Sequence, residues 1–224
     1  MAHSLVGHDK LGIDWLGYHM RSPGEILYNF HWVVPGEAAR SAQAYAGFLG
    51  PFLRAHGIAS IVNLRGAHPN YRWWRSEKRI AGRLAIQHFN PMLNSRRLPT
   101  RQMLVNLFAD FDAARHPMLI KCSGGQDRSS FASALYILHS KGWNALDAAR
   151  GQFARWPYLH FPKQHQRWLR AFVEYAQESA QGRPIAEWVA RDYTPEQFKA
   201  WLASHGLGDG FRGLYDKPGT APGI

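Results

Sequence analysis

The chain contains a single cysteine, and the residues around it have the types and spacing of a nucleophilic site. The apolar residues 118–120 lead into Lys121 and Cys122, and a glycine-bearing loop follows. After the loop, apolar residues recur at helical spacing, which predicts a helix over 127–141. A strand, a tight loop and a helix in this order point backbone N–H groups and the positive end of the helix dipole at one small volume, which favours anion binding.

These residue types suit attack by a thiolate on a phosphate ester. A helix N-terminus and nearby cations lower a cysteine pKa from about 8.5 toward roughly 3.5–7.5, and Lys121 and Arg128 supply cations here. The guanidinium of Arg128 can hold two phosphate oxygens at once, and the Ser129 hydroxyl can donate to the thiolate. The residues predicted to bind the phosphate beside Arg128 are Lys121, Ser123, Gly124, Gly125 and Gln126. The alternative is a buried structural cysteine followed by a surface arginine.

The loop resembles the Cys-x5-Arg-Ser/Thr signature of the cysteine-dependent protein tyrosine and dual-specificity phosphatases. Residues 57–66 and residues 35–43, which include Arg40, are similar to upstream elements of the atypical dual-specificity group, and the matches together span about residues 26–140. The resemblance implies that Cys122 is the nucleophile and that Arg128 clamps the phosphate. It also implies that Ser129 helps to resolve a phosphocysteine intermediate.

The chain departs from the family pattern at two places. The family has histidine before the cysteine, where this chain has Lys121. The family's general acid is an aspartate upstream of the cysteine, but residues 86–100 contain no carboxylate and Asn90 stands near the expected position. Asp127, inside the loop, remains as a candidate acid, as has been considered for some phosphoinositide phosphatases of the superfamily. The alternative for Asp127 is a structural partner that orients loop amides or pairs with a cation.

A length of 224 residues predicts one domain of ordinary size with a small appendage. A hydrophobic content of 46% is enough for a substantial core. A single cysteine excludes an intrachain disulfide. The chain has neither an apolar leader at its start nor an apolar run long enough to span a bilayer, so we expect a cytoplasmic protein. The histidine pairs His3/His8 and His160/His165 lack ligand spacing, so we expect no metal, and we expect no cofactor.

A net charge of +11 indicates an anionic partner, either a phosphorylated protein or a polyanionic small molecule. The densest basic cluster lies over residues 72–83, where Arg75 and Arg79 are predicted to form a rim for a highly charged substrate. The alternative is a solvated helix face with the neighbouring tryptophans in the core. Interleaved basic and aromatic residues also occur in nucleic-acid-binding proteins, but no nucleic-acid motif is present, so that partner is disfavoured.

Alternating strand and helix patterns predict the fold. Strands are expected over 26–34, 58–64, 86–89 and 119–121, and helices over 41–56, 71–84, 99–114, 127–141, 144–155 and 163–180. This order predicts an α/β fold with a mostly parallel central sheet and helices on both faces. Residues 1–182 are predicted to form the phosphatase-like domain, and residues 183–224 a helical extension followed by a Gly/Pro-rich tail.

Three functions remain open at this point. The first is hydrolysis of phosphate monoesters through a phosphocysteine. The second is a pseudophosphatase that binds phosphate without turnover, which the absence of the usual acid favours and the intact Cys122, Arg128 and Ser129 oppose. The third is a rhodanese-like sulfur carrier or an arsenate reductase, which the serine after Arg128 disfavours.

Overall fold

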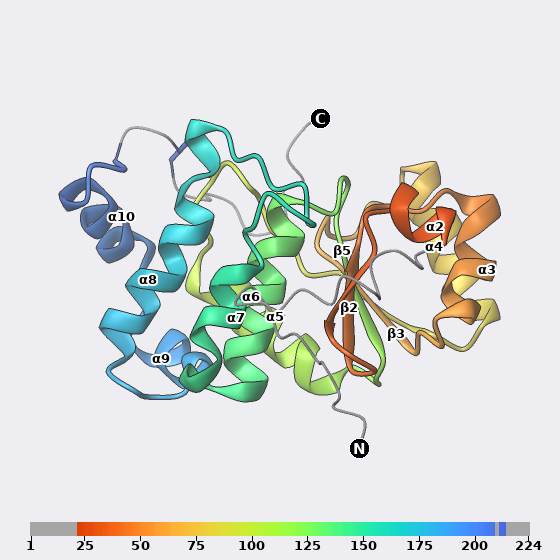
Figure 1. Ribbon diagram of the computed structural model, residues 1–224, viewed down its shortest axis with the longest axis horizontal. Coiled ribbons are helices and arrows are strands. Elements are labelled where there is room, and N and C mark those ends of the chain that lie inside the picture. The colour runs from red at the N-terminus through yellow and green to blue at the C-terminus, as the bar shows by residue number, and fades with distance from the viewer. Residues whose placement is uncertain (1–21, 209–210, 214–224) are drawn as a thin grey trace, which may run out of the picture.

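A five-stranded sheet lies at the centre of the computed structural model, which describes residues 22–208 and 211–213 (Figure 1). The strands are β1 (His31–Val34), β2 (Ala38–Ser41), β3 (Ser60–Asn63), β4 (Gln87–Phe89) and β5 (Met118–Lys121). Their order is β1-β2-β5-β3-β4, and every neighbouring pair is parallel except the β1–β2 hairpin. Strand β5 is therefore central, and its carboxyl end lies between those of β2 and β3.

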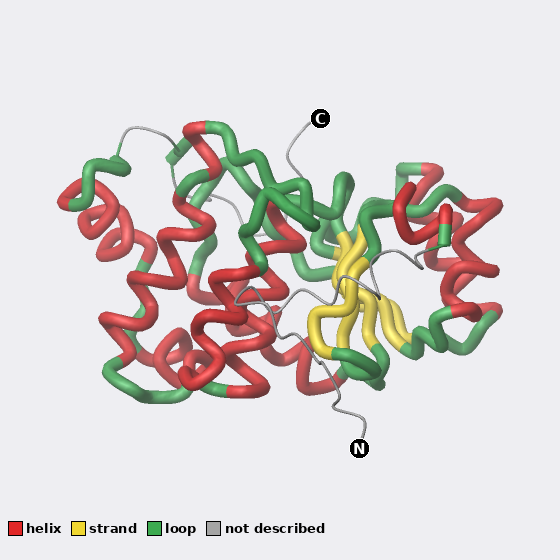
Figure 2. The backbone as a smooth tube through the Cα atoms, in the orientation of Figure 1, coloured by secondary structure: helices red, strands yellow, loops and turns green. Residues whose placement is uncertain are grey.

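Helices cover both faces of the sheet (Figure 2). One face carries α2 (Pro23–Leu27), α3 (Ala46–Ala55) and α4 (Arg72–Arg83). The other carries α5 (Arg101–Ala113), α6 (Asp127–Lys141), α7 (Leu146–Gly151), α8 (Trp168–Ala180), α9 (Ile185–Arg191) and α10 (Pro195–Ser204), with short 3-10 turns at Trp143–Ala145 and Gln164–Gln166. The predicted fold class, a mostly parallel sheet between helices, is confirmed.

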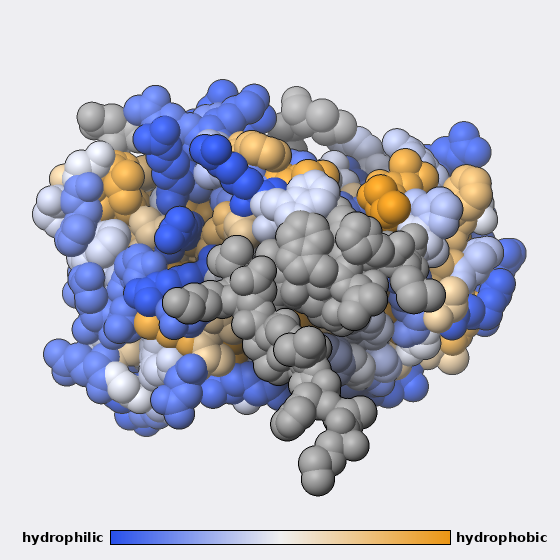
Figure 3. All heavy atoms as spheres, viewed as in Figure 1, coloured by the Kyte–Doolittle hydropathy of each residue, from blue (hydrophilic) through white to orange (hydrophobic). Residues whose placement is uncertain are grey.

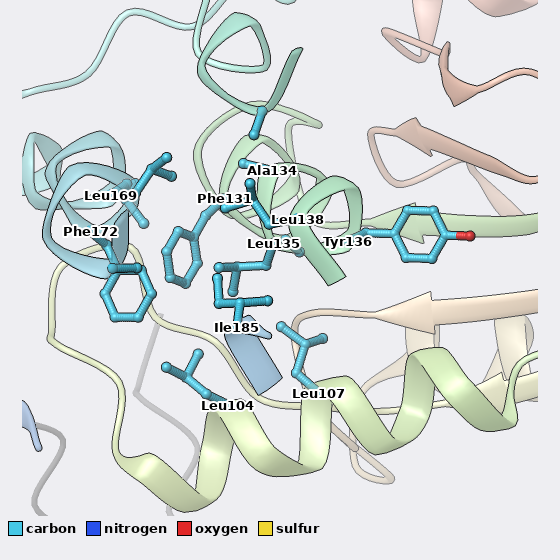
Figure 4. Close-up of a cluster of buried hydrophobic side chains, with 14 of the residues drawn as sticks. Leu104, Leu107, Phe131, Ala134, Leu135, Tyr136, Leu138, Leu169, Phe172 and Ile185 are labelled. Atoms are coloured by element: carbon cyan, nitrogen blue, oxygen red, sulfur yellow. The ribbon is translucent and has the colours of Figure 1, made fainter. Parts of the chain in front are cut away.

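Two hydrophobic cores result from the alternation of side chains along the strands. Ile61 and Leu119 face the smaller core with α3, whereas Val62 and Ile120 face the larger core with α5 and α6. Figure 4 shows the larger core, in which side chains from four helices point toward one another: Leu104, Leu107, Phe131, Leu135, Phe172 and Ile185. The sheet is thus buried on both sides, which fixes β5 and the loop that follows it.

The elements differ from the sequence prediction mainly around β2. The sequence predicts a helix from residue 41, but residues 38–41 form a short, fully buried strand beside β5. Helix α2 replaces the start of the strand predicted over 26–34, because Ser22 caps it with a capping box and Pro23 stands at its first turn. The helices predicted over 144–155 and 163–180 are shorter, and residues 152–163 form an irregular segment between them.

The predicted helical extension packs into the larger core. Trp188, Val189, Phe198 and Leu202 of α9 and α10 are buried in the same cluster as the residues of α5 and α6. Residues 1–21 and most of the predicted Gly/Pro-rich tail lie outside the described residues. Figure 3 shows a largely hydrophilic surface over the helices of the larger core. Among the described residues, no helix is both long enough and apolar enough to cross a membrane.

Candidate active site

Cys122 stands directly after the central strand, where the chain turns into the loop before α6. The N–H of Cys122 donates to the carbonyl of Ser41 on β2 (3.4 Å), and the carbonyl of Lys121 accepts from Leu64 after β3 (2.9 Å). The loop therefore starts from a point held by both neighbouring strands. Its position at the carboxyl edge of a parallel sheet is where open α/β folds bind their ligands.

The carbonyl groups of the loop are held by residues outside it. Ser123 O accepts from the N–H of Gln43 (3.0 Å), and Gly125 O accepts from Asn29 Nδ2 (3.0 Å) and from a terminal nitrogen of Arg40 (2.9 Å). By contrast, the N–H groups of Ser123, Gly124 and Gly125 donate to no acceptor in the described residues. Unpaired amides beside a helix N-terminus form an anion-binding concavity.

Arg40 is the main support of this loop geometry. Its side chain is fully buried, and besides Gly125 O it donates to Gln126 O (3.2 Å), Ser130 Oγ (2.8 Å) and Gln152 O (2.9 Å). Burial lowers the pKa of Arg40 to about 10, so it stays charged at neutral pH. One buried cation thus joins β2, the loop and the segment after α7.

Gly125 is required by the close packing of the loop against β2. Its φ is +65°, and an added Cβ would lie 2.5 Å from Ala42 N and 2.7 Å from Ser41 C. At Gly124 an added Cβ would meet only the side chain of Gln126, at 3.8 Å. The two glycines therefore differ: Gly125 permits the backbone contact, and Gly124 is sterically free.

The environment of Cys122 favours its thiolate. Burial of the sulfur acts to raise its pKa, but the Arg128 charge and hydrogen bonds from the Ser129 hydroxyl and from the N–H groups of Ser129 and Gln126 outweigh it, so the pKa is lowered. Arg128 makes no hydrogen bond or salt bridge to any residue in the described ranges, although its charge acts on Cys122. A half-buried guanidinium without a protein acceptor is available to a ligand.

The side chain of Lys121, predicted to bind phosphate, is buried and paired within the protein. Its side chain is 2% exposed, with Nζ 2.6 Å from Glu77 Oε2 and 2.5 Å from Gln43 Oε1. Burial lowers the pKa of Lys121 to about 8, although Glu77 acts in the opposite direction. Burial also acts to raise the pKa of Glu77, but donors including His88 and Lys121 bring it down to about 2. The cation before the cysteine is therefore paired with α4.

Asn90 is part of a hydrogen-bond network and does not occupy the place of a free acid. Its Oδ1 accepts from Asn63 Nδ2 (2.9 Å) and from Trp74 Nε1 (2.7 Å), and its Nδ2 donates to His88 O (3.3 Å). An aspartate in this position would accept the same two donors, which favour the ionised form. The side chain therefore connects β3, β4 and α4.

Asp127, the first residue of α6, is held by a hydrogen bond to one carboxylate oxygen, and the other oxygen lies near His160. Oδ2 accepts from Gln166 Nε2 (2.6 Å), and Oδ1 lies 3.5 Å from His160 Nε2. Burial raises the pKa of Asp127 above its usual value, and Arg128, Arg40 and Lys163 oppose this effect. A carboxyl group with a raised pKa next to the phosphate clamp can supply a proton.

His160 is the buried partner of Asp127. Its Nδ1 lies 3.2 Å from the carbonyl of Phe153, which can only accept, so Nδ1 carries the hydrogen. Burial lowers the pKa of His160 to about 4, so the ring is neutral at pH 7. Its Nε2 is then an acceptor, and it has no hydrogen-bond partner at normal distance. A proton on Oδ1 of Asp127 would satisfy this nitrogen.

Arg75 and Arg79 lie on the face of α4 away from the loop. The face toward the loop carries Trp73, whose ring stacks on Arg65 (3.6 Å) and lies 5.1 Å from Lys121 Nζ, and Glu77 one turn later. Positions 75 and 79 lie between these on the opposite side of the helix. Arg75 donates to the carbonyls of Pro69 and Asn70 before α4, and Arg79 is exposed.

Several supporting residues have no signal in the sequence. Asn29, Gln43 and Gln166 contact the loop or Asp127 from segments far along the chain, and polar residues of these types occur throughout the sequence. Arg40 has a signal only through the family resemblance. His160, to which the sequence assigns no role, is a neighbour of the loop carboxylate.

Comparison with known proteins adds the fold relationship. No protein-family model matches the chain, and no curated protein matches its sequence. The crystal structure of TpbA from P. aeruginosa matches with a TM-score of 0.52 at 16% identity, over 79% of this chain and 92% of that one. The Siw14 catalytic core, from S. cerevisiae, matches with a TM-score of 0.51 at 17% identity, over 82% and 95%.

A third match is a DUF442 protein from Shewanella putrefaciens CN-32 whose structure is described as that of a phosphatase. Its TM-score is 0.51 at 14% identity, over 69% of this chain and 97% of that one. The described part of this chain therefore shares the fold of these three solved structures.

Proposed function

We propose that this protein is a phosphatase that hydrolyses phosphate monoesters through a phosphocysteine intermediate. The observation that carries the proposal is the loop itself. Amides of Ser123, Gly124 and Gly125 without acceptors in the described residues, and the unpaired guanidinium of Arg128, surround a cysteine whose pKa is lowered. Donors fixed before the substrate arrives stabilise the charge that develops on a transferring phosphoryl group.

The residues act in sequence. The Cys122 thiolate attacks phosphorus, the S–P bond forms, the P–O bond to the leaving group breaks, and the leaving oxygen takes the proton of Asp127. Water then attacks the phosphocysteine and gives its proton to the Asp127 carboxylate, and the S–P bond breaks to release phosphate. Arg128 binds the equatorial oxygens in both steps. The Ser129 hydroxyl stabilises the departing thiolate.

A phosphate-binding protein without turnover is the second candidate. It is favoured by the contacts of Asp127, because Gln166 donates to Oδ2 and His160 lies 3.5 Å from Oδ1. Asn90, engaged by Asn63 and Trp74, offers no substitute acid. The two candidates differ in turnover and share phosphate binding.

The substrate class follows from charge. A chain with net charge +11 favours a phosphorylated protein or a polyanionic phosphorylated small molecule over a neutral ester. We place the activity in a reducing compartment such as the cytoplasm, because the mechanism needs a free thiolate at Cys122 and the chain has no second cysteine that could protect it as a disulfide.

Turnover of p-nitrophenyl phosphate tests the proposal. Cys122→Ser is expected to abolish release of nitrophenol while inorganic phosphate still binds, because the loop amides and Arg128 remain. Mass spectrometry of the acid-quenched wild type is expected to detect one phosphoryl group on Cys122. Arg54→Ala, on the exposed surface of α3, is the control and keeps wild-type turnover. Most of the turnover surviving in Cys122→Ser would refute the covalent mechanism, and binding without turnover in wild type would leave the second candidate.

A further inference from the structure

A cavity of about 410 Å³ opens next to Asp127, and two of its lining residues contact that carboxylate. Its lining residues come from the irregular segment after α7 and from the start of α8: Phe153, Ala154, Arg155, His160, Pro162, Gln166, Arg167 and Arg170. None of them is acidic. The volume is in the range of cavities that bind small molecules.

The charges of this cavity are not neutralised by the protein. The guanidinium groups of Arg167 and Arg170 form no ion pair or hydrogen bond with any residue in the described ranges, and that of Arg155 contacts only the ring of Phe161, at 6.0 Å. All three arginines line the same concave surface, which has no acidic lining residue. Such a surface has a positive potential that concentrates anions.

A buried polar atom also faces this region without a partner. His160 is 2% exposed, and its Nε2 makes no hydrogen bond within the described residues. The charges of Arg40, on the loop side, and Arg170, on the cavity side, both act to lower the pKa of His160.

Two residues that line the cavity also lie next to Asp127, at the end of the catalytic loop. Gln166 lines the cavity and donates to Asp127 Oδ2 (2.6 Å), while His160 lies 3.5 Å from Asp127 Oδ1. Asp127 directly precedes Arg128, the proposed phosphate clamp. One ligand with two anionic groups can therefore place one group on the loop and the other among the arginines.

We propose that this cavity is a second phosphate-binding site, which takes a phosphate group other than the one attacked by Cys122. The substrates of the protein would then be small molecules with more than one phosphate group; this assignment of substrates rests on the proposed function. Guanidinium groups favour phosphate because their planar fork pairs two oxygens at once. The site is separate from the exposed face of α4, where Arg75 and Arg79 are predicted to form a rim for such a substrate.

Pyrophosphate binding to the full-length Cys122→Ser protein tests the site without any need for turnover. Isothermal titration is expected to give two molecules per chain. Arg128→Ala should remove the loop site and leave one, and Arg167→Ala/Arg170→Ala should remove the other. The matched control is Arg54→Ala/Arg191→Ala, which removes two exposed arginines from α3 and α9 and should retain both sites. Circular dichroism checks that each variant is folded.

A single molecule per chain in Cys122→Ser, or two molecules that survive Arg167→Ala/Arg170→Ala, would overturn the cavity site. Equal weakening in the control pair would also overturn it, because the effect would then be one of total charge. Loss of both sites with Arg128→Ala alone would show that the cavity is not an independent site. None of these outcomes depends on whether the protein hydrolyses phosphate.

The substrate assignment needs a second measurement in the active protein. Phenyl phosphate and 1,3-phenylene bisphosphate have the same leaving-group chemistry but differ by one phosphate group. Arg167→Ala/Arg170→Ala should raise KM for the bisphosphate at least tenfold more than for the monophosphate. An equal change for both esters would overturn the assignment to substrate, even if pyrophosphate still binds. Absence of turnover for both esters in wild type would refute the proposed function and leave the titration result standing.

Discussion

At the scale of single residues, the site depends on charges that are paired or left unpaired. Lys121 and Arg40 are buried cations whose terminal nitrogens bind acceptors within the protein, whereas the Arg128 side chain has no acceptor in the described residues. The sequence places Lys121 and Arg128 near Cys122 and predicts that both bind phosphate, whereas the structure pairs Lys121 with Glu77. Pairing depends on segments far apart in the chain, so spacing cannot reveal it.

The prediction at this scale concerns Asp127 as the general acid. Removal of a general acid slows a reaction typically 10²–10⁴-fold when the leaving group is basic, and little when it leaves easily. Asp127→Asn is therefore expected to slow hydrolysis of an alkyl phosphate within that range and to affect p-nitrophenyl phosphate far less. Because the pKa of Asp127 is raised, its protonated form survives to higher pH than that of an ordinary carboxyl.

The pH dependence of the rate shows whether Asp127 acts as the acid. The rate on the alkyl ester should rise with pH as Cys122 loses its proton and fall as Asp127 loses its own, and Asp127→Asn should lack the falling limb. Asn90→Asp is the matched variant and should give no gain, because Asn63 and Trp74 donate to the oxygen at this position and would keep the new carboxyl ionised. If Asp127→Asn hydrolyses alkyl phosphates as fast as the wild type, Asp127 is not the general acid.

At the scale of elements, the strand–loop–helix unit could be predicted from the sequence and its support could not. Apolar residues before Cys122 and helical spacing after it define β5 and α6 closely. Strand β2 escapes the same reasoning because four buried residues, Ala38–Ser41, show neither alternation nor a run long enough to indicate a strand. It becomes a strand because β5 and the β1 hairpin pair with it.

The contact of the loop with β2 gives the element-scale prediction. Gly125→Ala places a methyl group within 2.7 Å of the backbone at Ser41 and Ala42, which cannot move without displacing β2. A shift of about 1 Å in a reacting group costs on the order of 10² in rate, so Gly125→Ala should lose at least this factor in kcat for an aryl phosphate. Gly124→Ala, one residue earlier, should remain close to wild type.

Equal losses in the two glycine variants would contradict the packing argument. Thermal melts separate the effects further. Gly125→Ala is expected to melt at a lower temperature than wild type because β2 and the loop are strained together, whereas Gly124→Ala should not.

At the scale of the whole molecule, the larger core includes the C-terminal helices. The sequence divides the chain after residue 182, since a Gly-Arg-Pro stretch interrupts the helical pattern there. The structure places Trp188 and Phe198 in one cluster with Phe172, and Tyr193 Oη donates to Pro99 O (2.7 Å). Residues on the two sides of position 182 therefore pack in one core, although the local sequence pattern breaks there.

Truncation of the chain tests whether the C-terminal helices are part of the same cooperative unit as the rest of the protein. A chain that ends after Gly182 loses Ile185, Trp188, Val189, Phe198 and Leu202, all buried. Each such side chain contributes about 1.5–3 kcal/mol by burial, and the sum reaches the 5–15 kcal/mol that stabilises a typical domain. The truncated chain should lose cooperative unfolding in a thermal melt followed by circular dichroism. A chain that ends after Gly213 keeps α9 and α10 and serves as the control; a cooperative melt of the shorter chain at the same temperature would restore the boundary at 182.

The contacts of Arg40 also govern when the thiol becomes reactive. Its guanidinium joins β2 to Gln152, 112 residues further along the chain. During synthesis from the N-terminus, the loop leaves the ribosome before Gln152, so Arg40 can contact the loop carbonyls before it contacts Gln152 O. We expect the loop to reach its final geometry, and the pKa of Cys122 to be fully lowered, only once the segment after α7 has folded. Because an un-ionised thiol is a poor target for oxidants, we expect the nascent chain to be less sensitive to oxidation than the folded protein.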